Sequence, residues 1–237
     1  MHKTKRILKH IEVMNNHLTD LKEGKLKKGK VSFYKDVNIK TLPNDIVEYK
    51  TPEHVSGFCQ FVRGGLSIKD LYLSKNIVDI HPFSLTFELE SLENIYVDPE
   101  NDYYCDIDGV LFTKDKKKLV AFPKGRIGDK YFVPEGTKII GENSFSRATI
   151  TEVVMPSTLE RFEKEVFLET KVFICNLLNC HDIRISSRCF YDGFGTYIIR
   201  DKKLVAEDML PTYYWTSSIT IVDGYSLNDV YSKIYLD

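Results

Sequence analysis

Apolar residues recur at a fixed step along the middle of the chain. The segment YFVPEGTKIIGENSFSRATITE is followed directly by VVMPSTLERFEKEVFLETKVFI, and five positions of the first segment have counterparts exactly one segment later. The pairs are 22 residues apart: Pro134 and Pro156, Thr137 and Leu159, Ile140 and Phe162, Phe145 and Phe167, and Ile150 and Val172. A period of roughly 20–29 residues is typical of a solenoid, whose coils bury a face only against their neighbours. We therefore expect a repeat solenoid with one continuous core.

The same spacing anchors further coils. An apolar residue followed by Pro or Ser, with further core positions three and six residues after that Pro or Ser, occurs at Leu42-Pro43 (Ile46, Tyr49), Leu73-Ser74 (Ile77, Ile80), Val133-Pro134 (Thr137, Ile140) and Met155-Pro156 (Leu159, Phe162). Proline closes a short strand because it has no amide hydrogen to continue a ladder. Leu85 stands where Phe145 and Phe167 stand in the later coils, so we expect all three to fill the core on the return side. Beyond Asn179 the register weakens, although 183–185, 219–221 and 234–236 each read as a strand.

The first 26 residues form a separate segment. Apolar residues at Ile7, Ile11, Met14, Leu18 and Leu21 predict an amphipathic helix over about residues 4 to 22, ahead of a solenoid over residues 27–237. The interpretation we favour is a cap over the open first coil. A short self-association helix and a basic helix that contacts a membrane surface or nucleic acid are the alternatives.

Two β-hairpin insertions are predicted, near residues 103–123 and 195–206. In the first, β-rich runs at 109–113 and 119–122 flank the charged turn 114–118. Gly195 and Asp201 repeat Gly109 and Asp115 at a distance of 86 residues, which suggests a second copy. We interpret the lysine-rich tip as a soluble turn that protects against edge pairing.

At this point the residues resemble a known family. The run VPEGTKIIGENSF is similar to the pattern IPxxVxxIGxxAF of the BspA-like leucine-rich repeats of bacterial proteins, and VDPENDYYCDIDGVLFTKDKKKLVAFPKG resembles an insert common in that family. The resemblance covers about residues 66–177. It implies a right-handed, curved leucine-rich-repeat superhelix with short parallel strands and a binding role, often at cell surfaces, with no catalytic residues to carry over.

Charge and cysteine usage narrow the remaining possibilities. Residues 1–30 hold nine Lys and Arg against three Asp and Glu, which leaves 24 against 31 in the rest. Five cysteines without regular spacing favour a reducing compartment, and no apolar run suits a membrane span or a secretion signal. The sequence as given thus predicts a cytoplasmic protein, or a cell-surface or secreted protein if a signal has been removed.

No enzymatic motif is present. The sequence lacks GxxxxGK[ST], HExxH, GxSxG and a GxGxxG that follows a strand. Cys175, Cys180, His181 and Cys189 do not have the spacing of a structural zinc site, so we interpret these cysteines as core residues. We expect no cofactor, no metal and no catalysis.

Strand alternation predicts a binding surface. In a strand of the form apolar-x-apolar, the middle residue lies on the face opposite the core. These middle residues are Tyr72, Tyr96, Phe132, Val154 and Asn176, with Tyr235 in the terminal coil. We expect the three aromatic residues among the first five to form one contiguous stripe, with Glu93, Asn94 and Glu152 beside it.

This stripe has two functional interpretations. The first is a protein–protein interaction scaffold, because exposed contiguous aromatic residues are enriched at interfaces. The second is a carbohydrate-binding or adhesion module that uses the rings as platforms. A purely structural aromatic ladder is a further alternative, and nucleic-acid binding through the basic N-terminal segment is remote.

Overall fold

The computed structural model describes residues 38–42, 44–87, 89–170, 173–181, 183–186, 188–190, 196–200 and 219–223. The predicted N-terminal helix, the strand at 234–236 and Tyr235 lie outside the described residues.

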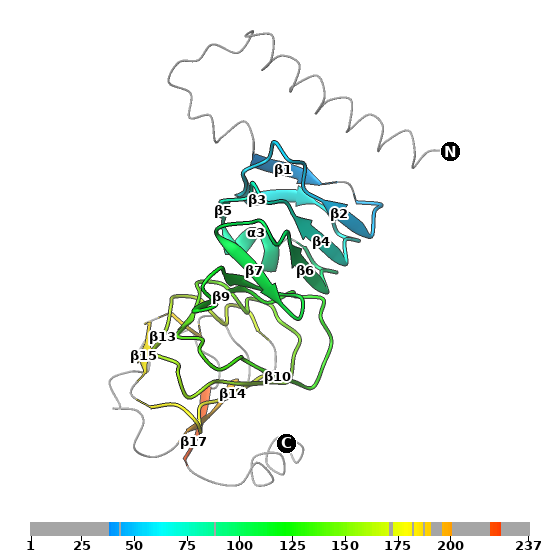
Figure 1. The fold of residues 1–237 in the computed structure, drawn as a ribbon. Coiled ribbons are helices and arrows are strands. Elements are labelled where there is room, and N and C mark those ends of the chain that lie inside the picture. The colour runs from blue at the N-terminus through cyan, green and yellow to red at the C-terminus, as the bar shows by residue number, and fades with distance from the viewer. Residues whose placement is uncertain are drawn as a thin grey trace, which may run out of the picture.

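Parallel strands stack coil upon coil along one wall of a solenoid (Figure 1). This wall consists of two ladders. The first contains β2 (Glu48–Lys50), β4 (Asp70–Leu73) and β6 (Asn94–Val97), and the second contains β10 (Lys130–Phe132), β12 (Glu152–Val154), β14 (Phe173–Asn176), β16 (Thr196–Arg200) and β17 (Ile219–Asp223). Tyr131 pairs with Val153, and Val153 pairs with Cys175. This register confirms the 22-residue step.

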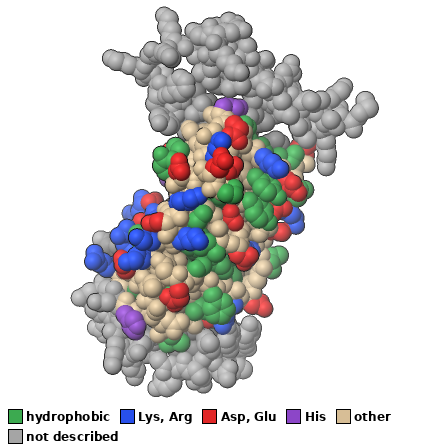
Figure 2. All heavy atoms as spheres, viewed as in Figure 1, with side chains coloured by type: hydrophobic (Ala, Val, Ile, Leu, Met, Phe, Trp, Pro, Cys, Tyr) green, Lys and Arg blue, Asp and Glu red, His purple; other side chains and the backbone are tan. Residues whose placement is uncertain are grey.

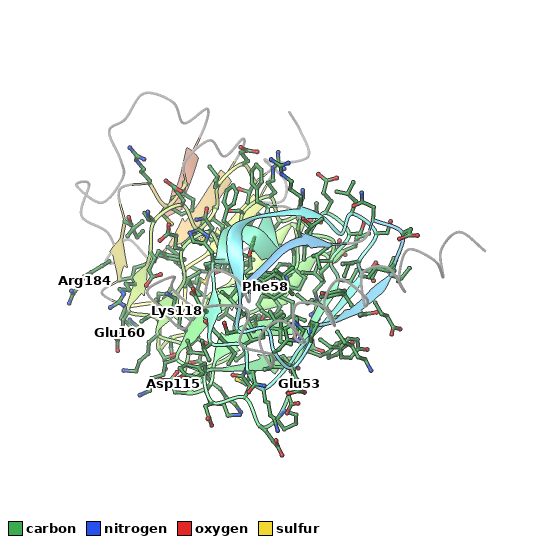
Figure 3. The ribbon with its side chains drawn as sticks, turned by 90° about the horizontal axis from the view of Figure 1, so that it is seen from above. Glu53, Phe58, Asp115, Lys118, Glu160 and Arg184 are labelled. Carbon is green, nitrogen blue, oxygen red and sulfur yellow. The ribbon has the colours of Figure 1, made fainter. Side chains whose placement is uncertain are left out.

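Two further sheets form the opposite wall. One contains β1 (Asn38–Leu42), β3 (Gly57–Gly64) and β5 (Asp79–Ile80), and the other has the order β15 (Arg184–Ile185), β13 (Arg161–Phe162), β11 (Ile139–Ile140), β9 (Lys118–Ala121), β8 (Val110–Thr113) and β7 (Tyr104–Ile107). One short helix, α3 (Pro82–Thr86), lies between the walls near β3. Figure 3 shows Lys118, Glu160 and Arg184 along one side of the molecule.

Phenylalanine rings stack through the interior of the C-terminal half. Phe122, Phe145, Phe167 and Phe190 are all fully buried, and the centroids of successive rings lie 5.0, 5.6 and 5.0 Å apart. The predicted burial of Phe145 and Phe167 as equivalents is therefore confirmed. Leu85 is fully buried in the N-terminal half, where the core is mostly aliphatic.

The polar surface follows the same step. Lys138 pairs with Glu160 at 2.5 Å, and Arg147 pairs with Glu169 at 2.8 Å, in each case across 22 residues. Figure 2 shows Lys and Arg side chains gathered with acidic ones on the side of β9 and β13. Exposed pairs of this kind each contribute about 0–1 kcal/mol, so they support the stacking without determining it.

The first predicted hairpin is present, and it is larger than expected. β8 pairs antiparallel with β9 and also with β7, through a two-residue turn at Asp108 and Gly109. Both turn residues have positive φ, at 50° and 74°, as a type I′ turn requires. The Asp-Gly pair in the sequence is typical of such a turn, so it is a local signal for the β7–β8 hairpin. β9 also pairs in parallel with β11, so the hairpin continues the sheet that forms the opposite wall of the C-terminal half.

The second predicted hairpin is not formed by its first strand. β16 pairs in parallel with β14 on one edge and with β17 on the other. A strand has only two edges, so no edge of β16 remains for an antiparallel partner from residues 204–206. The pairing of β16 therefore does not match an antiparallel hairpin, and residues 201–218 lie outside the described residues.

The first repeat anchor is also wrong. Tyr49 pairs with Leu71 in the ladder, whereas Ile80 pairs with Phe58 on the opposite wall. Thr51 and Pro52, followed by the buried Val55 and Phe58, are therefore the true counterparts of the second anchor. The earlier match at Leu42 had the right spacing on the wrong wall.

Candidate binding surface

Alternation in the first ladder gives one buried and one outward row. Tyr49, Leu71 and Ile95 share a register position and point into the core, with exposed fractions of 8, 0 and 0%. The next register position holds Lys50, Tyr72 and Tyr96, which therefore point outward. Tyr96 is 37% exposed and Tyr72 is half-buried.

The two outward tyrosines form a stacked pair. Their ring centroids lie 4.9 Å apart with an interplanar angle of 24°. Lys50 Nζ lies over the Tyr72 ring, 5.1 Å from its centroid, which is a cation–π contact. Partial burial, together with the nearby carboxylates of Glu48 and Asp70, raises the pKa of Tyr72. Its hydroxyl therefore stays protonated at neutral pH and can both donate and accept hydrogen bonds.

An open groove of about 310 Å³ adjoins this pair. The groove lies where β2, β4 and β6 end, so each of three coils contributes to it. Its lining combines the aromatic pair with charged and small polar side chains: Lys50, Thr51, Glu53, Tyr72, Leu73, Ser74, Tyr96, Val97, Asp98 and Pro99. Figure 2 shows hydrophobic side chains over the β4 and β6 region, surrounded by acidic and basic ones.

Glu93 and Asn94 come just before Tyr96 in the chain, and both are bonded to neighbours in the previous coil. Lys69 Nζ pairs with Glu93 Oε1 at 2.6 Å, and the Asn94 side-chain amide donates to Asp70 Oδ1 at 2.9 Å. These contacts fix the polar row next to the tyrosines. Lys50 and Glu53 of the groove were missed because the first coil was anchored on the wrong wall.

Phe132 does not extend the tyrosine pair. It lies in the second ladder, and the insert separates β6 from β10 in the chain. The insert also occupies the outer edge of β6, where Ile95 N–H donates to the Gly109 carbonyl at 2.9 Å. The expected contiguous stripe of three aromatic residues is therefore divided. Phe132 is exposed by itself, at 65%, with Lys130 Nζ 5.7 Å from its ring centroid.

Three further residues of the expected surface are buried. Glu152, Val154 and Asn176 have exposed fractions of 0, 9 and 4%, so the expectation that they form an exposed surface is wrong. The Glu152 carboxylate is bonded by its neighbours on both sides, at 2.9 Å by Lys130 Nζ and at 2.9 Å by the Asn176 side-chain amide. Val154 lies between Phe132 and Asn176 in the register. Contacts between coils therefore hold Glu152 and Asn176 in place on this ladder.

The sulfur-rich region shows no site chemistry. Cys175, Cys180 and Cys189 are buried free thiols. Burial raises the pKa of Cys180 to about 12 and raises the pKa of the other two thiols well above the usual value. Protonated thiols are poor nucleophiles and poor metal ligands. In the part of the chain that the structure describes, no three His, Cys, Asp or Glu residues are grouped as a metal site would need.

No helix among the described residues has the length and apolar character needed to cross a membrane.

Comparisons with known proteins identify the fold. No protein-family model matches the sequence, and no curated protein gives a significant match. A leucine-rich repeat protein from Eubacterium ventriosum matches in structure with a TM-score of 0.53 and 17% identity, over 73% of this chain and 54% of that one. A leucine-rich cell surface protein from Faecalibacterium prausnitzii matches with a TM-score of 0.44 and 14% identity, over 79% of this chain and 62% of that one.

The chain therefore spans 54% of the Eubacterium protein with which it shares its architecture, and at this identity the likeness concerns the fold alone. Together with the 22-residue register, it confirms the architecture that the BspA-like pattern implied. The protein has a leucine-rich repeat fold.

Proposed function

We propose that this protein is a non-catalytic binding scaffold that captures a partner protein through the ladder face around Tyr72 and Tyr96. A leucine-rich repeat solenoid fits a binding scaffold in general, because successive coils present side chains in rows on one surface. The single observation that carries the proposal is the outward tyrosine pair at the rim of a groove. Large aromatic side chains with polar neighbours supply most of the energy at protein interfaces.

Ring geometry favours a protein partner over a carbohydrate. A sugar platform needs an open aromatic face, but Tyr72 has Tyr96 stacked 4.9 Å away and Lys50 Nζ 5.1 Å from its centroid. Ring edges and hydroxyl groups remain, and the groove also carries the charged Glu53 and Asp98. These carboxylates accept hydrogen bonds from the Asn76 side-chain amide at 3.1 Å and from the Glu100 N–H at 2.9 Å. Such a mixture suits the polypeptide groups of a protein partner better than a flat sugar ring. A carbohydrate-binding module is the second candidate, because the pair combines aromatic rings with polar neighbours.

The test is the double variant Tyr72→Ser/Tyr96→Ser. The full chain is immobilised, incubated with a native lysate, and compared with the wild type for captured proteins and for the midpoint of urea unfolding. We expect capture to be lost while the midpoint changes little. Tyr103→Ser is the matched control, because Tyr103 is 54% exposed and does not line the groove.

Two results would reject the proposal: capture that survives the double substitution, or a large fall in the urea midpoint that explains the loss by unfolding. Binding to a glycan array without protein capture, abolished by the same variant, would favour the carbohydrate module. Phe132→Ser, tested separately, shows whether the isolated phenylalanine contributes.

A further inference from the structure

β10 is the first strand of its ladder, and it has an open edge. In a parallel ladder, alternate residues direct their backbone groups to opposite neighbours. On the β12 side, Glu152 N–H donates to the Asp129 carbonyl at 2.9 Å, and Val133 N–H donates to the Val154 carbonyl at 3.0 Å. The backbone groups of Lys130 and Phe132 therefore point to the other side, where the sheet order gives β10 no neighbouring strand.

The corresponding edge of the first ladder is closed. Ile95 N–H donates to the Gly109 carbonyl at 2.9 Å, and Val97 N–H donates to Asp106 Oδ1 at 2.8 Å. The insert thus satisfies the outward donors of β6. Among the described residues, no group bonds the outward backbone groups of Lys130 and Phe132. The two ladder edges on either side of the insert therefore differ: the edge of β6 is bonded, and the edge of β10 is open.

Exposed apolar side chains flank the open edge. Ile127 and Phe132 have the largest exposed fractions among the large hydrophobic residues described, at 91 and 65%. Lys130 is exposed, and its Nζ forms an ion pair with Glu152 Oε2 at 2.9 Å. The edge therefore presents an ordered strand with apolar side chains beside unpaired backbone donors and acceptors.

We propose that the open edge of β10 is a second binding site, which takes an extended segment of a partner protein as an added strand. The chemistry of the edge specifies the occupant, because donors and acceptors that alternate at strand spacing are matched by another extended backbone. An apolar side chain of the added strand packs beside Phe132, and cross-strand pairs of this kind stabilise sheets. The inference goes beyond the proposed function, because it uses none of the residues around Tyr72.

Short length keeps this edge from pairing indiscriminately. β10 has three residues and begins with Lys130, which follows the exposed Gly128 and Asp129. Very short edge strands that carry lysine are poor templates for aggregation. A partner must therefore add side-chain contacts to the few backbone bonds, which makes the site selective.

The probe is a synthetic blocked peptide, LENIYVDP, which corresponds to residues 92–99 and contains β6. This segment forms a parallel ladder strand in the protein, in register with β4. Amide hydrogen exchange of the full-length chain is measured by NMR with and without the peptide. We expect the amides of Lys130 and Phe132 to exchange about tenfold more slowly with saturating peptide. Unchanged exchange at these two amides would overturn the proposal.

A matched pair of variants isolates the backbone donor. Lys130→Ala and Lys130→Pro both remove the ammonium group, but only proline removes the outward N–H. That N–H takes no part in the pairing with β12, so both variants should unfold at the same urea concentration. We expect Lys130→Pro to bind the peptide about tenfold more weakly than Lys130→Ala. Equal binding would overturn the proposal, and the exchange result on the wild type decides the matter if the proline variant unfolds early.

Sedimentation of the wild type and of both variants tests whether a second copy of this chain occupies the edge. A concentration-dependent dimer that persists in Lys130→Ala and disappears in Lys130→Pro would assign the edge to a second copy of this chain, and would overturn the assignment to a partner. We expect the wild type, Lys130→Ala and Lys130→Pro to have the same sedimentation coefficient.

Discussion

Both halves of the solenoid stack aromatic rings from coil to coil, but on opposite sides of the wall. In the N-terminal half, Tyr72 and Tyr96 stack outside at 4.9 Å, whereas phenylalanines in the C-terminal half stack inside at 5.0–5.6 Å. The similar spacing follows from the coil step, because ladder neighbours lie about 4.8 Å apart. A periodic aromatic residue therefore identifies the repeat, and its side of the wall decides whether the ring is buried in the core or lies on the outward face where we propose binding.

The largest effect should come from the inner stack. Phe145→Ala or Phe167→Ala removes a fully buried ring from between two others, and we expect a loss of about 3–5 kcal/mol in the free energy of unfolding. Urea unfolding of the full chain measures this loss. Unfolding curves that overlay the wild type would show that the inner stack is not part of the core.

The next effect concerns Asn101, which is fully buried and stands where Ile77 stands one coil earlier. Its side-chain amide donates to the carbonyls of Ser74 and Ile77 at 3.0 and 2.8 Å, and its oxygen accepts from two backbone N–H groups at 2.8 Å. Asn101→Ala leaves these buried groups without partners, so we expect a loss of about 2–3 kcal/mol in urea unfolding.

Asn101→Leu is the matched variant. It restores apolar volume of the kind that Ile77 supplies, but it supplies no hydrogen bonds. It should therefore stay destabilised, and a leucine variant as stable as the wild type would show that packing matters there more than the polar network.

A smaller, pH-dependent effect is expected at Glu163. Burial disfavours its charged form, but hydrogen bonds from Lys118 Nζ at 2.7 Å and from the Glu142 amide at 3.0 Å outweigh burial and lower the pKa of the carboxyl. A folded-state pKa below the unfolded value stabilises the protein above the unfolded pKa, and this contribution is lost as the pH falls through the folded value. Glu163→Gln should cost about 1 kcal/mol at neutral pH.

Urea unfolding across a pH series checks this sign. The difference between the wild type and Glu163→Gln should shrink as the pH falls below the usual glutamate pKa of about 4.3. A difference that stays constant as the pH falls through and below that value would mean that the charge of Glu163 contributes nothing. Glu160→Gln, at the exposed pair with Lys138, is the control and should have a smaller effect.

The smallest effect on stability should come from the outer stack. Tyr72→Ser/Tyr96→Ser removes a cross-strand pair on an exposed face, and such pairs contribute about 0.2–1 kcal/mol. We expect the urea midpoint to fall only slightly. A loss as large as that of Phe145→Ala would place the tyrosines in the core and remove the contrast between the halves.

The step of the solenoid could be predicted from the sequence, because packing alone enforces it. Phe145 and Phe167 fall 22 residues apart, and the structure stacks them at 5.6 Å. The wall on which a pattern lies could not be read in the same way. Both walls use short strands with buried apolar residues, so the match at Leu42 was placed on the wrong one.

The candidate surface was only partly predictable. Alternation placed Tyr72 and Tyr96 on the outward face, but it carries no information about contacts between coils. Such contacts bury Glu152 and Asn176, and the insert keeps Phe132 out of the first ladder. The groove combines the ends of three strands, so no local pattern announces it.

The most direct test of this contrast is hydroxyl-radical footprinting of the native chain, read residue by residue by mass spectrometry. Both stacks are aromatic and comparably reactive when exposed, so oxidation rates report which side of the wall each ring occupies. We predict rapid oxidation of Tyr72 and Tyr96, and protection of Phe145 and Phe167 until the protein unfolds. Comparable rates for the two stacks in the folded protein would contradict the placement of one stack on the outward face and of the other in the core.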